Sequence, residues 1–469
     1  MKKDPLTPIR DGSDVTGREA LRIITRLSVP AILAMLASVL MQYIDASMVG
    51  SLGANASAAI GLVSSTTWLI GWIVQAAGVG FTVLIAHAIG AGNEIKARAI
   101  VKGGLAFVMI LCGFFTVLSV VLAPHLPRIL GGEEAIYREA YLYFLIWALS
   151  LPLMQIRFTA GGMLECSGNI RLPSILNILM CVLNVVFNAV LIFPQITVPG
   201  TALVIPGAGL GVVGAALATT AASAVAALSM LGYLLFGSEA LRLRRGEKEK
   251  MSRKELGRAV KISLPVALQS AVTGGAYVAA TGLVAPLGSV AVAANSLSIT
   301  AESVCYMPSA GIATAATTIV GQSIGAKRHD LTGRLGWTVV FFGIAVQTVS
   351  GALLYIFAPQ MIGLLSPVPE IRALGTQVLR LEAFAEPLYG ASQVALGVLR
   401  GLGDTFVPSI LNFATMWLIR LPLAAFVFIP RSGLYGYWTA MVIELVCRGL
   451  IFLCYLRFRA LRRVRGKEV

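Results

Sequence analysis

The sequence predicts an all-α polytopic membrane protein, with twelve transmembrane helices in two six-helix bundles. Three observations support this fold class. Hydrophobic residues make up 57% of the 469 residues and charged residues only 13%, whereas about 25% of the residues in an ordinary soluble domain are charged. Apolar stretches long enough to cross a hydrocarbon core about 30 Å thick recur along the chain. The second half of the chain repeats the first half.

Twelve apolar stretches have the length of a membrane-crossing helix. Those in the first half cover about residues 27–50, 56–88, 101–123, 137–163, 172–194 and 209–236. Those in the second half cover about residues 259–286, 292–324, 335–357, 372–399, 406–429 and 434–456. The stretches are continuous rather than alternating, which favours helices over the strands of a membrane barrel.

The spans divide the chain into five predicted regions. In chain order these are a cytoplasmic N-terminal segment, an N-terminal six-helix lobe, a basic cytoplasmic linker, a C-terminal six-helix lobe and a basic cytoplasmic tail. Their boundaries are 1–26, 27–237, 238–258, 259–456 and 457–469. The polar N-terminus lacks the features of a cleavable signal peptide, so we expect insertion into a plasma membrane, such as the inner membrane of bacteria.

The formal net charge of +15 follows the expected membrane topology and does not indicate nucleic-acid binding. Basic residues cluster in Leu241–Lys261 and in Arg457–Val469, whereas the loops Gly50–Ser57 and Phe193–Gly211 contain no Lys or Arg. Positive residues in short loops mark the cytoplasmic side of a membrane protein. Both termini are therefore predicted to be cytoplasmic.

An internal repeat holds a constant offset of 235 residues. Pro152–Asn177 aligns without gaps to Pro387–Asn412, with 11 of 26 positions identical. A single register kept over a long segment indicates duplication of a whole structural unit. Each copy contains an even number of spans, so both copies enter the membrane in the same orientation. A pseudo-twofold axis along the membrane normal is therefore predicted to relate the two bundles.

Four segments resemble the MATE (multidrug and toxic compound extrusion) transporters: YIDASMVGSLGANASAAIGL, GVGFTVLIAHAIGAGN, GVLRGLGDTFVPSILN and LIRLPLA. The resemblance covers both halves of the chain, over about residues 25–455. It implies a twelve-helix exporter of organic, often cationic, amphiphiles in exchange for protons or sodium ions. It is closer to the DinF-like branch, because the first-span aspartate of that branch falls on Asp45.

Asp45 lies inside the first apolar stretch and is the leading candidate for the ion-coupling group. An aspartate at the centre of a membrane helix costs roughly 2.5–3.5 kcal/mol, so it is usually retained for function. Gln42, one helical turn earlier, is placed to hydrogen-bond it. The alternative is a structural aspartate that accepts hydrogen bonds and holds helices together.

Asn184 and Asn188 in the fifth span share a helix face, because they are four residues apart. Together with Asp45 they form the predicted ion-coupling set. If sodium is the coupling ion, Asp45 and Asn184 are the expected ligands. Relatives of the DinF-like branch often carry Asp where this chain has Asn188, so one ionisable group of that branch is missing. The alternative role of the pair is helix–helix hydrogen bonding.

The second half carries other polar residues within its spans. Another branch of the family has a glutamate in the seventh span and an aspartate in the tenth, at positions that correspond here to Thr273 and Tyr389. The predicted substrate-binding residues are Gln42, Tyr277, Glu302, Glu386 and Tyr389. The alternative for the glutamates, Glu382 included, is a structural ion pair with Arg420. Glu444 and Arg448 are four residues apart and can neutralise one another.

Together with the resemblance, these residues predict a secondary active multidrug efflux antiporter that exports amphiphilic, cationic compounds by alternating access. Its expected partners are small amphiphilic molecules and the lipid bilayer. We expect a monomer that needs no cofactor besides the coupling ion, H⁺ or Na⁺. The alternative is a flippase for a lipid-linked intermediate. An enzyme is not expected, because the sequence contains no HExxH or Walker A motif.

Overall fold

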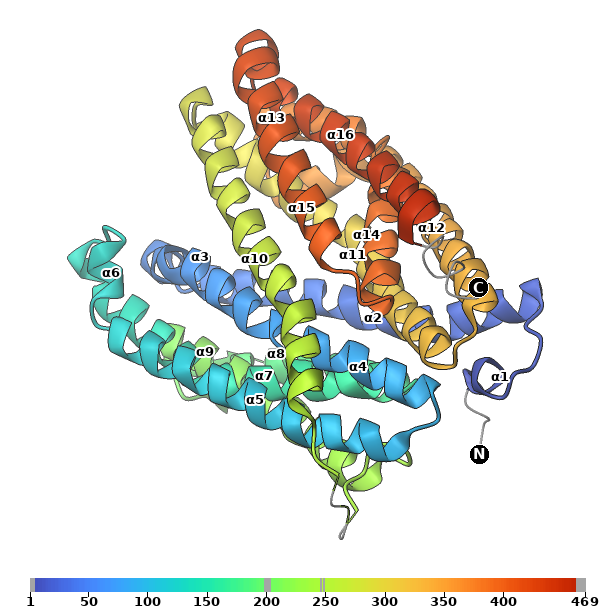
Figure 1. The fold of residues 1–469 in the computed structure, drawn as a ribbon. Coiled ribbons are helices and arrows are strands. Elements are labelled where there is room, and N and C mark those ends of the chain that lie inside the picture. Colours follow the sequence, from blue (N-terminus) through green and yellow to red (C-terminus); the bar gives the residue numbers. More distant parts are fainter. Residues whose placement is uncertain (1–4, 198–203, 245–246, 248, 461–469) are drawn as a thin grey trace. The chain divides into compact units, whose positions relative to one another are not determined.

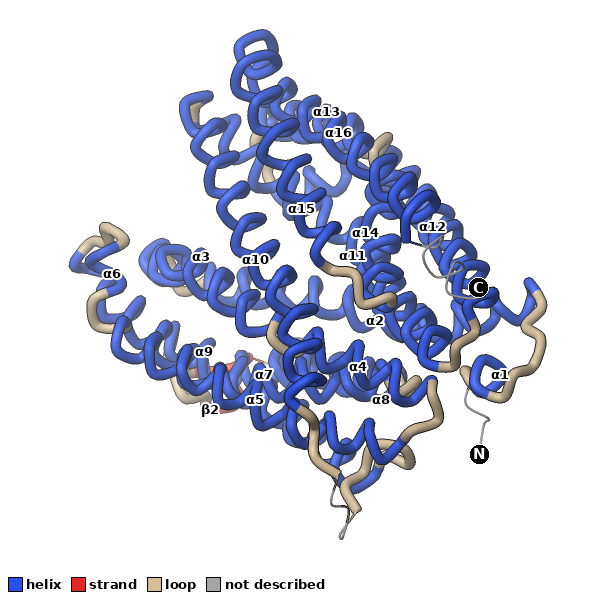
Figure 2. The backbone as a smooth tube through the Cα atoms, in the orientation of Figure 1, coloured by secondary structure: helices blue, strands red, loops and turns tan. Residues whose placement is uncertain are grey.

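A computed structural model describes residues 5–197, 204–244, 247 and 249–460 (Figure 1). Within these ranges the fold is almost wholly helical, as Figure 2 shows, which confirms the predicted fold class. The two short strands described there, β1 (Gln195–Thr197) and β2 (Val204–Pro206), pair antiparallel. Most of the predicted basic tail, parts of the linker and the centre of the loop at 193–211 lie outside the described residues.

The helices follow the predicted spans closely. In the first half the helical elements are α1 (Thr7–Arg10), α2 (Gly17–Gly50), α3 (Ala54–Ala76), α4 (Val79–Gly90), α5 (Glu94–Leu122), α6 (Leu126–Ile129), α7 (Glu134–Cys166), α8 (Arg171–Ile192), α9 (Gly211–Gly232) and the π-turn η1 (Tyr233–Gly237). In the second half they are α10 (Arg253–Val284), η2 (Ala285–Leu287), α11 (Ser289–Gly325), α12 (His329–Leu365), α13 (Pro369–Glu382), α14 (Glu386–Gly401), α15 (Phe406–Ala414), η3 (Thr415–Arg420), η4 (Leu423–Phe428), α16 (Ile429–Tyr455) and η5 (Leu456–Ala460).

Among the described residues, ten helical stretches are long and apolar enough to cross a membrane. Nine of them match the first nine predicted spans. The last, Phe406–Phe458, contains both the eleventh and the twelfth predicted spans, which are separated by the non-helical residues Ser432 and Gly433. The predicted span 372–399 is broken into α13 and α14, each shorter than a membrane-crossing helix. The difference from twelve therefore has two local causes.

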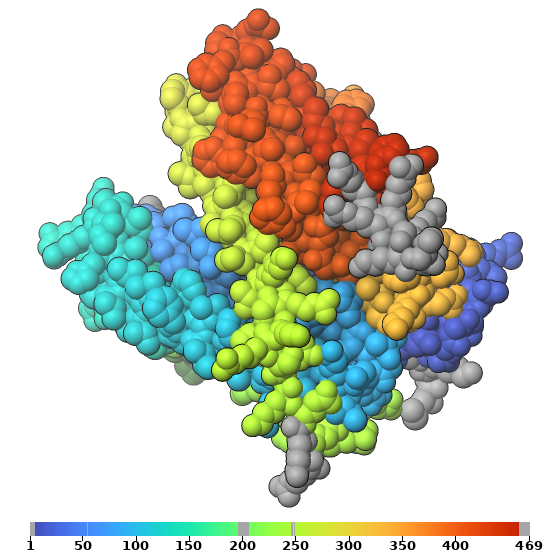
Figure 3. Space-filling view, viewed as in Figure 1, coloured from blue at the N-terminus to red at the C-terminus, as the bar shows by residue number. Residues whose placement is uncertain are grey.

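The chain divides into two compact units. The first-half unit consists of residues 37–85 and 94–260, and the second-half unit of residues 1–36, 86–93 and 261–469. Residues 27–36 and 86–93, which belong to the predicted N-terminal lobe, fall in the second-half unit. Within each unit, side chains fill the spaces between neighbouring helices, as the space-filling view shows (Figure 3).

Both repeats open with the same helix-starting device. At the start of α2, the Thr16 amide donates to the Glu19 carboxylate and the Glu19 amide donates to the Thr16 hydroxyl. At the start of α10, Ser252 and Glu255 exchange the same two hydrogen bonds. Such a capping box satisfies amide groups that the first helical turn leaves without partners. The two long helices therefore begin at Gly17 and Arg253, ahead of the predicted spans that start at about residues 27 and 259.

A glycine pair related by the repeat allows a backbone-to-backbone crossing inside the second-half unit. Gly90 and Gly325 are 235 residues apart, which is the offset of the repeat. A Cβ atom on Gly90 would overlap the backbone carbonyl of Gln322, and one on Gly325 would overlap the carbonyl of His87. The imidazole Nε2 of His87 also lies 2.8 Å from the carbonyl oxygen of Gly401. The end of α4 is therefore tightly bound to α11 and α14.

We expect Gly325→Ala to lower the free energy of unfolding by about 1–3 kcal/mol, because the added methyl group forces two backbones apart. The matched control is Gly113→Ala in α5, where nothing lies within 4 Å of a Cβ atom. Thermal unfolding of the purified variants in detergent measures the difference. Equal midpoints for the two variants would contradict the close crossing.

Candidate functional site

Asp45 lies at the centre of a polar cluster in the first-half unit. Asn188 on α8 donates from Nδ2 to the Asp45 Oδ1 atom at 2.5 Å and to the Asn184 Oδ1 atom at 3.0 Å. Asn184 donates in turn to the hydroxyl of Thr219 on α9 at 3.0 Å. Both asparagines are buried. The structure therefore brings the three predicted ion-coupling residues together and adds Thr219 to them.

The cluster belongs to a longer contact between the end of α2 and α8. The Ser38 hydroxyl lies 4.0 Å from the Cys181 sulfur, seven residues before the Asp45–Asn188 contact on both helices. A spacing of seven residues is two helical turns, about 10 Å along the axis. The two helices therefore run side by side in the same direction here, with Cys181, Asn184 and Asn188 on one face of α8.

The cluster has the chemistry of a proton or small-cation site. The Asn188 Oδ1 atom is buried without a hydrogen-bond partner, so an acceptor is free beside the Asp45 carboxylate. Carboxylate, amide and hydroxyl oxygens are the ligands that hard cations prefer. A cation between Asp45 and Asn188 would replace the short hydrogen bond that now joins them. Among the described residues, no group of three or more His, Cys, Asp or Glu side chains forms a metal site.

Gln42 does not join this cluster. It is exposed on α2, and the side chain that donates a hydrogen bond to Asp45 is Asn188. Sequence analysis missed Thr219 and Ser38 for a simple reason. Isolated hydroxyl groups are common in membrane helices, and only the register of α2, α8 and α9 shows which of them contact the face of α8 that carries Cys181 and Asn184.

A second polar cluster lies in the second-half unit, where the tenth predicted span is broken. Glu382 ends α13 and Glu386 begins α14, and both side chains are buried. The Gln347 side chain on α12 donates to the Glu386 carboxylate at 2.6 Å and to the Cys305 carbonyl at 2.8 Å. Glu302 on α11 lies close enough to Glu382 for the two carboxyl groups to interact electrostatically. Two neighbouring carboxyl groups can share one proton, so this cluster can hold a proton.

Arg420 forms its ion pair with Glu444, a partner that the sequence analysis did not consider. Its guanidinium binds the Glu444 carboxylate at 2.6 and 3.1 Å, and Arg448 lies 3.4 Å from the same carboxylate. The prediction that Glu444 and Arg448 neutralise one another is therefore confirmed, and Arg420 joins them. The predicted alternative, in which Arg420 pairs with Glu302, Glu382 or Glu386, is wrong, because Arg420 pairs with Glu444.

The predicted substrate-binding residues belong to two units. Gln42 lies in the first-half unit and the other four in the second-half unit. The Tyr389 ring packs edge-on against Tyr306 at 5.9 Å, and the Arg448 guanidinium lies 5.8 Å from its centroid. Tyr277 is 46% exposed on α10. Tyr277 lies near Glu302. Tyr389 lies near Glu386 and Tyr277, so the two tyrosines border the carboxyl cluster.

A serine-hydrolase pattern occurs in the chain but does not form a catalytic site. Gly321–Gly325 reads GQSIG, which fits the GxSxG pattern of nucleophile serines. That pattern requires a sharp turn between a strand and a helix. Here the five residues end the long helix α11, and the buried Ser323 hydroxyl donates to the Ile319 carbonyl. Ser323 is a helix-packing residue.

A known protein family matches the chain twice, once in each half. The MatE family model matches residues 30–190 and again residues 265–426. The chain belongs to the MatE family. The two matches begin at Pro30 and Pro265, which are separated by the offset that the internal repeat predicts. Each half of the chain is therefore one copy of the MatE unit.

Relatives of this MatE protein cover nearly its whole length. It is 28% identical to the probable multidrug resistance protein NorM of Thermotoga maritima, over 93% of this chain and 92% of that protein. It is 26% identical to the multidrug resistance protein NorM of Aliivibrio fischeri, over 94% of each chain. A crystal structure of MATE in complex with MaL6 shares the fold with a TM-score of 0.89, at 20% identity over 99% of this chain and 100% of the other.

We expect Glu444→Gln to destabilise this MatE chain by about 3–5 kcal/mol, because it leaves Arg420 buried without its counter-charge. Glu386→Gln is the matched control. It also removes a buried carboxylate, but the new amide oxygen can still accept from Gln347, so we expect a loss below about 1.5 kcal/mol. Thermal unfolding in detergent compares the two. A similar loss for both would show that the ion pair with Arg420 contributes no special stability.

Proposed function

We propose that this chain is a secondary active multidrug efflux transporter, an antiporter that exports amphiphilic, cationic compounds in exchange for protons or sodium ions. The observation that carries the proposal is the Asp45 cluster: a carboxylate inside a predicted membrane span with no basic partner in its hydrogen-bond network. Membership of the MatE family and relatives named as multidrug resistance proteins support the export of drugs.

The chain acts in the plasma membrane, with both termini on the cytoplasmic side and as a monomer. Its relatives are bacterial, which agrees with insertion in an inner membrane. The first-span aspartate favours a place near the DinF-like branch. Asn188, where that branch often has Asp, indicates that one carboxylate is sufficient here, because the neighbouring amides and the Thr219 hydroxyl supply the other polar groups.

The geometry suggests how an ion is sensed. In the ionised form Asp45 accepts a hydrogen bond from the Asn188 amide nitrogen. A protonated Asp45 is itself a donor, and the unpartnered Asn188 Oδ1 atom is the acceptor closest at hand in the network. Reversing this contact turns the Asn188 amide, which also holds Asn184 and through it Thr219 on α9. Ion binding at α2 thereby alters the contact between α8 and α9.

Coupling requires only that the ion and the substrate favour different states of the protein. One charge crossing a potential of 100 mV supplies about 2.3 kcal/mol. That free energy is enough to change a two-state ratio by roughly fifty-fold. A flippase for lipid-linked intermediates is not favoured, because the relatives that cover the whole chain carry the name of multidrug resistance proteins.

We expect Asp45→Asn to reduce gradient-driven efflux of a cationic dye from proteoliposomes at least tenfold, because the variant can neither exchange a proton nor hold a cation by charge. The change is isosteric, and the new amide can still hydrogen-bond Asn188. Proton and sodium gradients are imposed separately, and the gradient that drives efflux of the unmodified protein identifies the coupling ion.

Dye binding, measured by fluorescence polarisation, is expected to persist in Asp45→Asn. Glu386→Gln, which removes a carboxylate of the second polar cluster, is measured beside it, and an equal loss of efflux would show that coupling is not specific to Asp45. Efflux by Asp45→Asn at the rate of the unmodified protein would make Asp45 structural and direct attention to Glu302 and Glu386. Failure of the unmodified protein to move dye under either gradient would overturn the drug-export proposal.

A further inference from the structure

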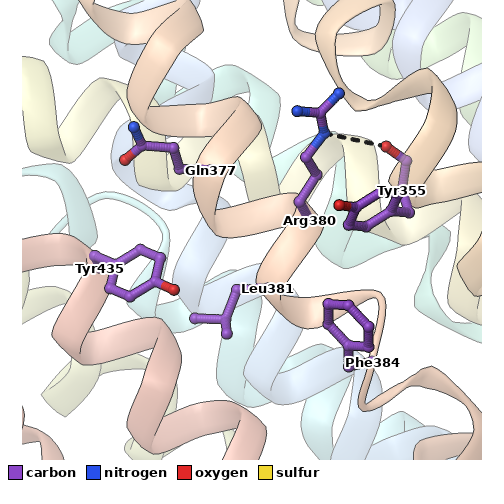
Figure 4. A pocket seen from close by; sticks show the side chains of 6 residues that line it. All are labelled: Tyr355, Gln377, Arg380, Leu381, Phe384 and Tyr435. Atoms are coloured by element: carbon purple, nitrogen blue, oxygen red, sulfur yellow. Dashed lines mark hydrogen bonds between the residues drawn. The ribbon is translucent and has the colours of Figure 1, made fainter.

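The second-half unit contains an open cavity on its outer surface that has no place in the ion-coupling scheme. Its volume is about 520 Å³. It lies between α12, α13 and α16 and is lined by Tyr355, Gln377, Arg380, Leu381, Phe384 and Tyr435 (Figure 4). In Figure 4 the rings of Tyr355 and Phe384 lie on one side of Leu381 and the ring of Tyr435 on the other. The cavity thus combines an aromatic wall with one guanidinium.

Two contacts with Tyr355 hold the Arg380 side chain in place, but neither neutralises its charge. Its Nε atom donates to the Tyr355 carbonyl at 3.3 Å, and the guanidinium carbon lies 5.3 Å from the centroid of the Tyr355 ring. These contacts orient the group and leave both terminal nitrogens available. In the part of the chain that the structure describes, Arg380 forms no ion pair with a carboxylate, unlike Arg420 and Arg448. No carboxylate among the described residues therefore compensates its positive charge.

The surroundings of the cavity are those of a lipid-facing surface. Along α12, the side chains of Phe341, Val349, Leu353 and Ile356 form an exposed apolar stripe. Phe384, at the break between α13 and α14, is 71% exposed. Arg380 is the twelfth residue of α13, about 16 Å from the start of that helix at 1.5 Å per residue. An unpaired arginine on a lipid-facing surface is costly unless an anion reaches it.

The internal repeat shows that this arrangement is specific to the second half. At the offset of 235 residues, Tyr355 corresponds to Val120, Gln377 to Leu142 and Arg380 to Leu145. Leu381 and Phe384 correspond to Ile146 and Leu149. The first copy has only aliphatic residues at these five positions. Val120 lies on α5, and α7 continues unbroken through the other four. The polar and aromatic groups are therefore not required by the fold that the two copies share.

We propose that this cavity binds an anionic phospholipid, with its phosphate on the terminal nitrogens of Arg380 and an acyl chain along the exposed stripe of α12. Guanidinium groups bind phosphate through two parallel hydrogen bonds. Basic pockets between transmembrane helices are known to hold anionic lipid headgroups. The Gln377 amide and the Tyr435 hydroxyl supply further polar groups for the glycerol region, and the rings of Tyr355 and Phe384 flank the chain.

The test uses the full-length protein with phosphatidylglycerol and phosphatidylcholine of identical acyl chains. Native mass spectrometry of the detergent-purified protein counts bound lipid, and competition between the two lipids gives their relative affinity. We expect one phosphatidylglycerol held at least tenfold more tightly than phosphatidylcholine. Arg380→Leu, which restores the residue of the first copy, should abolish that preference. Arg372→Gln, which removes another exposed arginine of α13, should leave it unchanged.

Three results would overturn the proposal. They are equal binding of the two lipids by the unmodified protein, an unchanged preference in Arg380→Leu, and an equal loss in Arg372→Gln. Addition of millimolar inorganic phosphate distinguishes a lipid site from a site for free anions: displacement of the lipid would show that the free ion is the ligand. If Arg380→Leu fails to fold by gel filtration, Arg380→Gln keeps a polar side chain and removes only the charge.

Discussion

Every ionisable group inside a membrane span must find polar partners, and this constraint organises both units of the chain. The cost of an unsatisfied charge in a low-dielectric medium exceeds the gain from any single packing contact. The partner of Asp45 is an asparagine amide, that of Glu386 is a glutamine amide, and those of Glu444 are two guanidinium groups. Only the last solution balances charge. The first two leave carboxyl groups that can change their ionisation without breaking an ion pair.

The two copies of the repeat share a backbone but not a chemistry. Glycine and proline positions such as Pro30 and Pro265, or Gly90 and Gly325, recur in register because helix approach depends on them. Asp45 corresponds to Ala280, and Glu386 to Leu151. Duplication therefore produced two similar helical frameworks, and each later acquired its own buried carboxyl groups. The differences between the copies point to function more directly than their similarities do.

Sequence alone could predict the first nine spans and the position of Asp45 on the first of them, because hydrophobic length and the repeat register are local properties. The partners of Asp45 could be predicted only in part. Asn184 and Asn188 share a helix face whatever surrounds α8, whereas Thr219 joins them only through the packing of α9. The break at residues 383–385 was not predictable, because Pro387 in the first turn of α14 has a counterpart in Pro152 of the first copy, where α7 continues unbroken. It depends on the burial of Glu382 and Glu386, which tertiary contacts decide.

The two long capped helices, α2 and α10, are each divided between the two compact units. The first turns of α2 belong to the second-half unit, up to Leu36, and the first turns of α10 belong to the first-half unit, up to Val260. Each duplicated half thus lends the beginning of its leading helix to the other half. A half-chain synthesised by itself would lack these borrowed turns. Neither half of the chain therefore contains all the residues of one compact unit.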